Sequence, residues 1–375
     1  MTRGQPIRVL IVDDSAIVRK VLAETLSAEP DITVVGTAPD PYIARDKILA
    51  LEPDVLTLDI EMPRMDGLTF LKKLMQFHPV PAIVISSLTQ PSCRVAIEAL
   101  ELGAVDVLAK PGGPYSVGEL RHSLGQKIRG AARARVRRNS SGCAGADETQ
   151  PACPAAALDA SPRSERETVI AIGASTGGTE AITHVLTRLP ADSPPIVITQ
   201  HIPPGFSRAF ANRLNERCAM EVREAQDGDE IRSGLALVAP GDFHMVIRQG
   251  GGRRFVNVKA GPRVCYQRPS VDVMFLSVAE TAGAHATGIL LTGMGTDGAH
   301  GLLKMRQAGA RTLAQNEDTC VVFGMPREAI LLGAASDVLP LSSIPGHILR
   351  GTSVTVRPAL AGASLSPPKV AGSSS

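Results

Sequence analysis

Val169-Ile-Ala-Ile-Gly-Ala-Ser-Thr-Gly-Gly178 is the stretch that decides how the second half of the chain folds. A short apolar run ends at Gly173, Ser175 stands between small residues, and apolar residues at helical spacing continue to Leu189. This order predicts a strand, a tight turn and a helix.

The turn allows two chemical interpretations. Backbone N–H groups at the start of a helix attract anions, so a glycine-rich turn of this kind can hold a phosphate or a dinucleotide. Gly173 to Gly177 also fits the pattern G-x-S-x-G, in which a tight turn presents the Ser175 hydroxyl as a nucleophile. The motif alone leaves both interpretations open.

Two further polar residues favour the nucleophile. His201 follows a predicted strand at residues 196–200, and Asp297 follows another at 288–292. Serine needs a histidine to take its proton, and the histidine needs an acid to orient it. The order Ser, His, Asp argues against the usual α/β-hydrolase fold. Rival candidates for the histidine and the acid are His184, His244, His285, His300, Asp242 and Asp272.

Strands and helices alternate throughout the first half of the chain. Apolar periodicity predicts strands at 7–12, 32–35, 55–58, 82–85 and 105–108, and helices at 16–26, 41–50, 68–75, 94–102 and 117–128. Such alternation is typical of a doubly wound, parallel α/β sheet. The second half predicts another, mainly parallel α/β domain. We expect residues 235–238, 245–247 and 255–258 to form an antiparallel extension of its sheet.

Polar residues gather at the predicted strand ends of the first domain. Asp13 and Asp14 end the first strand and Asp59 the third, while Ser86 and Lys110 end the fourth and fifth. The carboxyl edge of a parallel sheet is where ligands bind. Three carboxylates converging there repel one another unless a hard cation lies among them, which indicates a Mg²⁺ site.

Composition narrows the class of protein. A chain of 375 residues should form more than one domain, and 44% hydrophobic residues suffice for buried cores. The net charge of +2 argues against nucleic-acid binding, and we expect neither a signal peptide nor membrane insertion. The cysteines show no metal-binding spacing, so a cytoplasmic protein with reduced thiols is predicted.

Two segments differ in composition from the rest. Residues 129–167 begin with an arginine-rich run, which can be a solvated helix end or a partner-binding patch, and continue with Ser, Gly, Ala and Pro. This composition predicts a flexible linker between domains at 6–128 and 168–350. Residues 351–375 have a similar composition and predict a disordered tail.

The first domain resembles the receiver domain of bacterial response regulators. The resemblance rests on Asp13-Asp14, on Leu58 to Gly67, on Ser86 and on Lys110-Pro111. It implies that Asp59 accepts a phosphoryl group from a histidine kinase, and that Asp13, Asp14 and Asp59 hold Mg²⁺ with a backbone carbonyl near Glu61. It also implies that Ser86 and Lys110 contact the phosphoryl oxygens. The switch position, usually aromatic, is Val107 here.

The second domain is similar to the catalytic domain of the chemotaxis methylesterase (CheB) family. The similar motifs are residues 172–182, 200–203, 238–241, 269–272 and 291–299. The resemblance implies a phosphorylation-activated esterase that hydrolyses glutamate methyl esters on chemoreceptors and deamidates certain glutamines. It makes Ser175 the nucleophile, His201 the general base and acid, and Asp297 the orienting carboxylate. The backbone N–H of Met294 would help form the oxyanion hole, and ester hydrolysis would need no cofactor.

Two other functions compete with the esterase. The second domain could bind a nucleotide or a protein partner without catalysis, although His201 would then have no role. A DNA-binding regulator is the third hypothesis, which the near-neutral charge disfavours.

Overall fold

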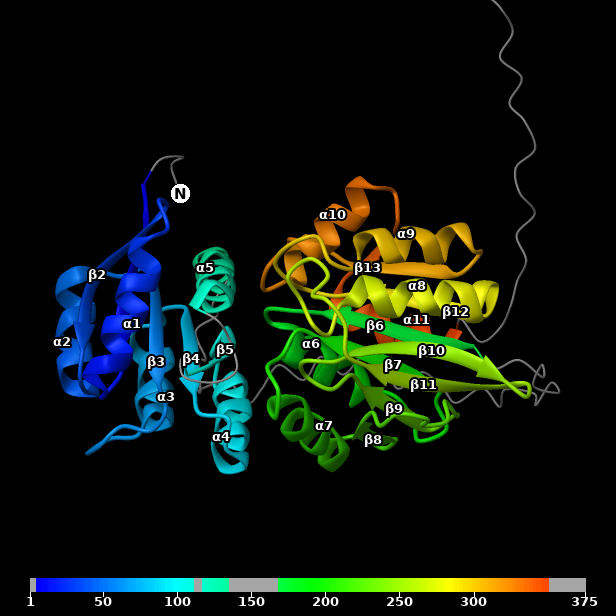
Figure 1. Ribbon diagram of the computed structural model, residues 1–375, viewed down its shortest axis with the longest axis horizontal. Helices are drawn as coiled ribbons and strands as arrows, with labels where there is room; N and C mark the ends of the chain where they lie inside the picture. Colours follow the sequence, from blue (N-terminus) through cyan, green and yellow to red (C-terminus); the bar gives the residue numbers. More distant parts are fainter. Residues whose placement is uncertain (1–4, 111–116, 135–167, 351–375) are drawn as a thin grey trace, which may run out of the picture.

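The computed structural model describes residues 5–110, 117–134 and 168–350 (Figure 1). The rest of the predicted linker and the predicted tail lie outside these residues. Two parallel sheets form, each with helices on both faces, so the predicted fold class is confirmed.

The first sheet has the strand order β2-β1-β3-β4-β5. Every neighbouring pair is parallel. Its strands are β1 (Ile7–Val12), β2 (Ile32–Ala38), β3 (Val55–Asp59), β4 (Ala82–Ser86) and β5 (Asp106–Ala109). Side chains of β1 alternate between the two faces. Leu10 and Val12 pack toward one helical layer, and Val9 and Ile11 pack toward the other.

Five helices cover the first sheet. They are α1 (Ala16–Ser27), α2 (Pro41–Leu51), α3 (Gly67–Phe77), α4 (Gln90–Glu101) and α5 (Val117–Arg133). Helix α5 is longer than predicted, since it continues to Arg133 rather than ending at residue 128. Ala131 and Ala132 are buried in the core, and Arg129 forms ion pairs with Glu29 and Asp31. The start of the arginine-rich run therefore belongs to a helix of the first domain.

The second sheet has the order β14-β13-β12-β6-β7-β9-β8, and all its pairs are parallel. Its strands are β6 (Val169–Ala174), β7 (Ile196–Gln200), β8 (Glu221–Glu224), β9 (Leu235–Val238), β12 (Ala286–Leu290), β13 (Arg311–Gln315) and β14 (Asp337–Leu339). From β6 the chain builds the sheet first on one side, through β7, and later on the other side, through β12. The crevice beside β6 is therefore a topological switch point, where ligands bind in such sheets.

Helices also cover both faces of the second sheet. One layer contains α6 (Gly178–Leu186), α7 (Phe206–Arg217) and α11 (Ile344–Arg350), and the other contains α8 (Val271–Thr281), α9 (Ala299–Gln307) and α10 (Met325–Leu331). Short 3₁₀ helices are η1 (Gly283–His285), η2 (Glu317–Thr319) and η3 (Leu341–Ser343).

The antiparallel segment differs in part from its prediction. Strands β10 (His244–Gly250) and β11 (Arg253–Lys259) pair as a hairpin, as predicted, but they form a separate sheet. Residues 235–238 join the parallel sheet instead, as β9. The hairpin buries Met245, Ile247 and Val256 in the core around α8. The hairpin thus packs against α8 and does not pair with an edge strand of the parallel sheet.

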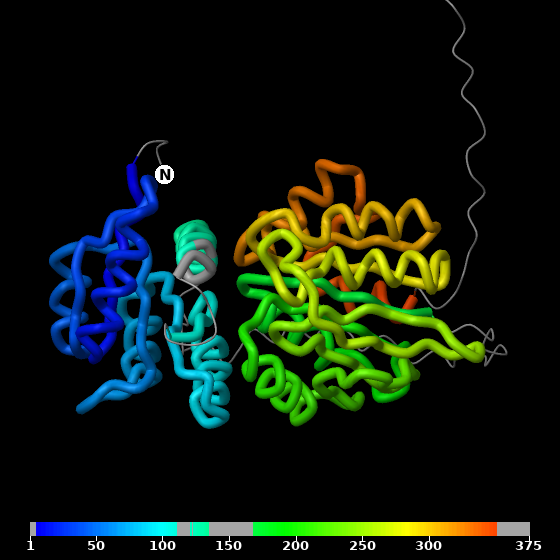
Figure 2. Tube along the Cα trace, viewed as in Figure 1, coloured from blue at the N-terminus to red at the C-terminus, as the bar shows by residue number. Residues whose placement is uncertain are grey.

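The two domains lie side by side, with α4 and α5 on the side of the first domain that faces the second (Figure 2). Helix α4 packs against α7. Arg213 and Arg217 of α7 both form ion pairs with Glu101 at the end of α4. These contacts join α4 of the first domain to α7 of the second.

Candidate active site

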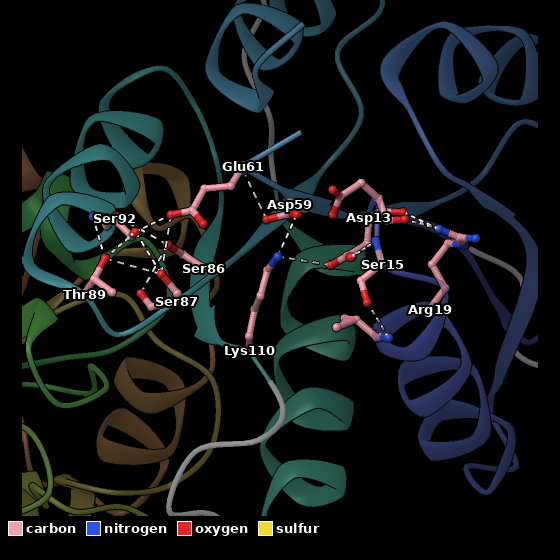
Figure 3. Close-up of polar contacts among 12 residues, drawn as sticks. Asp13, Ser15, Arg19, Asp59, Glu61, Ser86, Ser87, Thr89, Ser92 and Lys110 are labelled. Atoms are coloured by element: carbon pink, nitrogen blue, oxygen red, sulfur yellow. Dashed lines mark hydrogen bonds and ion pairs between the residues drawn. The ribbon is translucent and has the colours of Figure 1, made fainter. Parts of the chain in front are cut away.

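A cluster of carboxylates lies at the carboxyl edge of the first sheet. Asp13, Asp14 and Asp59 bring oxygen atoms within 4.8 Å of one another. The Lys110 ammonium donates a hydrogen bond of 2.7 Å to Asp59 Oδ2 and lies 3.8 Å from Asp13 Oδ2 (Figure 3). The structure therefore brings together the acidic residues and the lysine predicted at these strand ends.

The electrostatics of this cluster favour a cation. Burial and, after it, the neighbouring charge of Asp59 raise the pKa of Asp13 to about 6. Burial also raises the pKa of Asp59, against the lowering effect of Lys110. Asp13 Oδ2 is buried and accepts no hydrogen bond. A hard divalent cation fits these three carboxylates, because it would place a positive charge next to Asp13 Oδ2, which has no hydrogen-bond donor.

Ser86 lies at the end of β4, next to this cluster, but its hydroxyl donates to the Ser92 carbonyl oxygen at 3.3 Å. Glu61 donates its N–H to Asp59 Oδ1 at 3.2 Å, and its carboxylate accepts a hydrogen bond from Ser92 (Figure 3). Val107 is buried in the core within β5. No aromatic ring at this position can change rotamer in response to a phosphoryl group.

The strand ends of the second sheet bring the other predicted residues together. Ser175 follows β6 and His201 follows β7, and the paired register of Ala174 with Gln200 makes them the next residues along adjacent strands. The His201 N–H donates to the Ala174 carbonyl at 3.1 Å. Asp297 lies in the loop between β12 and α9. Ser175, His201 and Asp297 are only 7%, 5% and 2% exposed.

His201 and Asp297 form a buried hydrogen-bonded pair. His201 Nε2 lies 2.8 Å from Asp297 Oδ2, whereas His201 Nδ1 is buried and has no hydrogen-bond partner. An ionised carboxylate accepts the proton of Nε2, so the neutral ring carries its lone pair on Nδ1. Nδ1 is thus the nitrogen that is free to accept a proton.

Asp297 is held in its charged form. Burial alone would raise its pKa, but the hydrogen bond and charge of His201, together with the N–H groups of Asp272 and Val271, bring the pKa below its ordinary value. The Ser270 hydroxyl donates to the same carboxylate at 2.8 Å. Ser270 lies within the motif at residues 269–272, but the sequence alone gave it no role at the site.

Three of the rival residues have other partners. His244 contacts the Pro262 carbonyl and the Ser270 N–H, Asp272 accepts from the Gly301 N–H, and Asp242 forms ion pairs with Arg263 and Arg268. His184 lies on α6, His285 in η1 and His300 on α9. In the described part of the chain, Asp297 is the carboxylate that contacts His201.

The loop after β12 lies directly against Ser175. A side chain at Gly293 would come within 2.7 Å of Ser175 Cβ, so glycine is needed for this close approach. Met294 follows, and its backbone N–H has no acceptor among the residues that the structure describes. A free N–H beside the serine can receive a developing negative charge.

The first domain covers this edge of the second sheet. Asp106 on β5 accepts a hydrogen bond of 2.7 Å from Thr176, the residue after Ser175, and both side chains are buried. The other oxygen of Asp106 accepts from Lys127 on α5 at 2.5 Å. Gly130 of α5 lies against Met294 and Thr176, since a Cβ atom there would be 3.6 Å from each. The first domain therefore contacts both the residue that follows Ser175 and Met294 in the loop beside it.

No helix in the described ranges is long and apolar enough to span a bilayer.

Comparisons with known proteins match both halves of the chain. A family profile described as CheB methylesterase matches residues 170–348, and one described as response regulator receiver domain matches residues 9–120. A Syntrophus aciditrophicus protein named protein-glutamate methylesterase/protein-glutamine glutaminase 2 is 55% identical over 92% of this chain and 98% of its own length. A Salmonella typhimurium protein named protein-glutamate methylesterase/protein-glutamine glutaminase is 51% identical over 92% of this chain and 96% of its own.

A solved structure is also similar. The catalytic domain of the CheB methylesterase of Thermotoga maritima has 37% sequence identity and a TM-score of 0.48. The match covers 49% of this chain and 98% of that one.

Proposed function

The chain belongs to the CheB methylesterase family, and we propose that it hydrolyses glutamate methyl esters and deamidates glutamines on chemoreceptors, using Ser175, His201 and Asp297. The observation that carries the choice of residues is the buried His201–Asp297 pair beside Ser175 at the switch point of the second sheet. Phosphorylation of the first domain activates this reaction.

The geometry supports acyl transfer by a serine nucleophile. The Ser175 hydroxyl attacks the ester carbonyl carbon while His201 Nδ1 takes its proton. The imidazolium then gives that proton to the leaving methoxide, or to the leaving amine of a glutamine. Water, activated by the same nitrogen, hydrolyses the acyl-enzyme. Here the base is Nδ1, because Nε2 is bound to Asp297.

Asp297 and Met294 act on the charges that develop. Asp297 keeps the Nε2–H tautomer of His201 and stabilises the imidazolium. The Met294 N–H receives the oxyanion of the tetrahedral intermediate, a contribution typically of about 10²–10³-fold in rate per donor.

Regulation belongs to the carboxylate cluster of the first domain. Asp59 accepts the phosphoryl group of a histidine kinase, and Ser86 and Lys110 contact its oxygens. Asp13, Asp14 and Asp59 would hold Mg²⁺, which neutralises charge on the transferring phosphoryl group. The hydroxyl of Ser86 turns from the Ser92 carbonyl when the phosphoryl group is present.

The buried hydrogen bond between Asp106 and Thr176 connects the two domains. Asp106 belongs to β5, the strand after which Lys110 follows. When Asp59 is phosphorylated, Lys110 contacts the phosphoryl group. This contact weakens the packing of β5 and α5 on the second domain, and Ser175 becomes accessible. This coupling needs no aromatic side chain at residue 107.

The domains span residues 6–128 and 168–350, and the extension of α5 to Arg133 belongs to the first domain. The protein works in the cytoplasm.

The test is methanol release from membranes that carry methylated receptors, with and without a small-molecule phosphodonor and Mg²⁺. Ser175→Ala should lower turnover by about 10⁴–10⁶-fold. Asp59→Asn should keep the basal rate and lose the stimulation by phosphodonor.

Retained turnover in Ser175→Ala would defeat the assignment of the nucleophile. Absence of release from every variant, with Asp59 still phosphorylated in the wild type, would defeat the esterase itself. Nucleotide binding by the second domain would then be measured.

A further inference from the structure

Asp297 receives hydrogen bonds from the start of a helix as well as from His201. The Ser270 hydroxyl donates to Asp297 Oδ1 at 2.8 Å, the Asp272 N–H donates to the same oxygen at 3.0 Å, and the Val271 N–H donates to Oδ2 at 2.7 Å. Ser270 is the N-cap of α8, and the two N–H groups belong to its first turn. The triad carboxylate thus occupies the anion-binding end of a helix.

Helices α8 and α9 hold each other through two aspartates. Asp297 precedes α9 and accepts from the start of α8, while Asp272 in α8 accepts from the Gly301 N–H in α9 at 2.6 Å. A side chain at Gly301 would come within 2.7 Å of Phe275 Cβ, so the two helices approach closely. The carboxylate of Asp297 therefore lies between the starts of α8 and α9, whose backbones these contacts hold together.

Ser270 is itself fixed at the start of α8. Its N–H donates to His244 Nδ1 at 3.2 Å, and His244 Nε2 lies 2.8 Å from the Pro262 carbonyl oxygen, to which it donates. Ser270 and His244 are both buried. The hydroxyl is left to donate to Asp297 and to accept the weak capping bond from the Val273 N–H at 3.4 Å.

We infer that Ser270 is a positioning residue for the hydrolysis, a role that rests on the proposed function. Apart from His201, Ser270 is the residue in the described ranges whose side chain donates to Asp297. Its hydroxyl holds Oδ1 so that Oδ2 stays directed at His201 Nε2. Without this bond, Oδ1 keeps only the Asp272 N–H as a donor, so the carboxylate is less firmly held about its side-chain torsion and orients the imidazole less well.

The experiment compares Ser270→Ala and Ser270→Thr with Ser277→Ala in the full-length, phosphorylated protein. Ser277 is the matched control because it is buried on the same helix and bonds the Met274 carbonyl and the Ile247 N–H, away from the triad. Three quantities are measured: kcat and KM for methanol release, the rate of inactivation by a fluorophosphonate, and the midpoint of thermal unfolding.

Loss of a hydrogen bond to a charged group predicts a fall of about 10–100-fold in kcat for Ser270→Ala, with KM within about 2-fold of wild type. The fluorophosphonate rate should fall by the same factor, because it depends on activation of Ser175 and not on the receptor. Ser270→Thr keeps the hydroxyl and should restore kcat to within about 5-fold of wild type. Ser277→Ala should lower the unfolding midpoint and leave kcat within about 2-fold.

Wild-type kcat in Ser270→Ala would overturn the inference, as would equal losses of kcat in Ser270→Ala and Ser277→Ala at equal losses of stability. A fluorophosphonate rate that depends on Ser270 in a protein that releases no methanol would support the positioning role and defeat the proposed substrate. A wild type that shows neither reaction would defeat both.

Discussion

Both domains place aspartates at the carboxyl edge of a parallel sheet, yet the two groups of carboxylates are built in opposite ways. In the first domain, the single ammonium group of Lys110 contacts Asp59 and Asp13, and Asp13 Oδ2 accepts no hydrogen bond. In the second, one carboxylate, Asp297, accepts from His201, Ser270, Val271 and Asp272.

Burial acts to raise the pKa of both Asp13 and Asp297; the charge of Asp59 raises that of Asp13 further, whereas His201 and two backbone N–H groups lower that of Asp297. The pKa of Asp13 is raised to about 6, whereas that of Asp297 is lowered. A carboxylate with too few donors favours a cation or a proton from solution, so it can respond to a ligand. A carboxylate whose oxygens are all engaged keeps its charge and position, as an orienting group must.

The largest effect on activity should come from Asp297→Asn, which removes the negative charge from the carboxylate that accepts four hydrogen bonds. The amide must turn an NH₂ group toward one of the donors, so we expect kcat to fall by about 10³–10⁴-fold and stability by about 2–3 kcal/mol. Methanol release and denaturant unfolding measure the two effects. Asp272→Asn is the control, because its amide oxygen can still accept from Gly301. An equal loss of kcat in Asp272→Asn would contradict the distinct roles of the two aspartates.

Asp13→Asn should have the opposite effect on stability. Because the pKa of Asp13 in the folded state is about 6, against an ordinary value of 3.8, its ionisation at pH 7 costs stability. Neutralisation should therefore stabilise the protein by about 1–2 kcal/mol at pH 7 without divalent cations. The folded state binds its proton first as the pH falls, so this gain should shrink between pH 6 and pH 4.

Thermal unfolding in EDTA at several pH values tests this prediction. Asp46→Asn provides a control, since Asp46 is exposed and lies on α2. A destabilised Asp13→Asn protein at pH 7 would show that the cluster is not short of positive charge.

Mg²⁺ should supply the positive charge that the carboxylate cluster of the first domain lacks. At a concentration of about ten times its dissociation constant, Mg²⁺ should stabilise the wild type by about 1.4 kcal/mol. The stabilisation by Mg²⁺ should largely vanish in Asp13→Asn. It should persist in Asp297→Asn, because both oxygens of Asp297 already accept hydrogen bonds. Unfolding midpoints with Mg²⁺ and with EDTA give the comparison. Equal stabilisation of all three proteins would place the cation elsewhere.

The smallest effect concerns the link between the two sites. Thr176→Val removes the hydrogen bond to Asp106 while nearly keeping the shape of the side chain. Loss of about 1 kcal/mol of domain contact should raise kcat/KM of the unphosphorylated protein by about 5-fold and leave that of the phosphorylated protein unchanged. Thr183→Val is the control, since its hydroxyl bonds only within α6. A basal rate that stays at the wild-type level would remove this bond from the regulation.

Sequence patterns could predict the sites as far as strand ends determine them. Asp13, Asp59 and Lys110 each end or follow a buried strand of one parallel sheet, so their convergence follows from the fold. His201 could be ranked above its rivals for the same reason. The choice between Asp297 and Asp272 could not be derived from spacing, because it depends on how closely α8 and α9 pack.

Contacts across long stretches of sequence escaped prediction. Ser270 bonds a residue 27 positions away, and Thr176 bonds one 70 positions away in the other domain. Both residues lie in the motifs named above, but no local pattern indicates their partners. The end of α5 was misjudged for a related reason. Its arginines suggested a linker, but Arg129 pairs with Glu29 and Asp31, which only the folded first domain brings near.

Under the proposed regulation, in which the first domain covers Ser175, the substrate itself acts as an activator by mass action. A receptor that binds only the uncovered enzyme draws the covered population toward it. The apparent KM then rises in inverse proportion to the uncovered fraction, while kcat at saturation stays the same. Receptor density and phosphorylation therefore act on one equilibrium. An unphosphorylated molecule within a dense receptor array demethylates faster than the same molecule among sparse receptors.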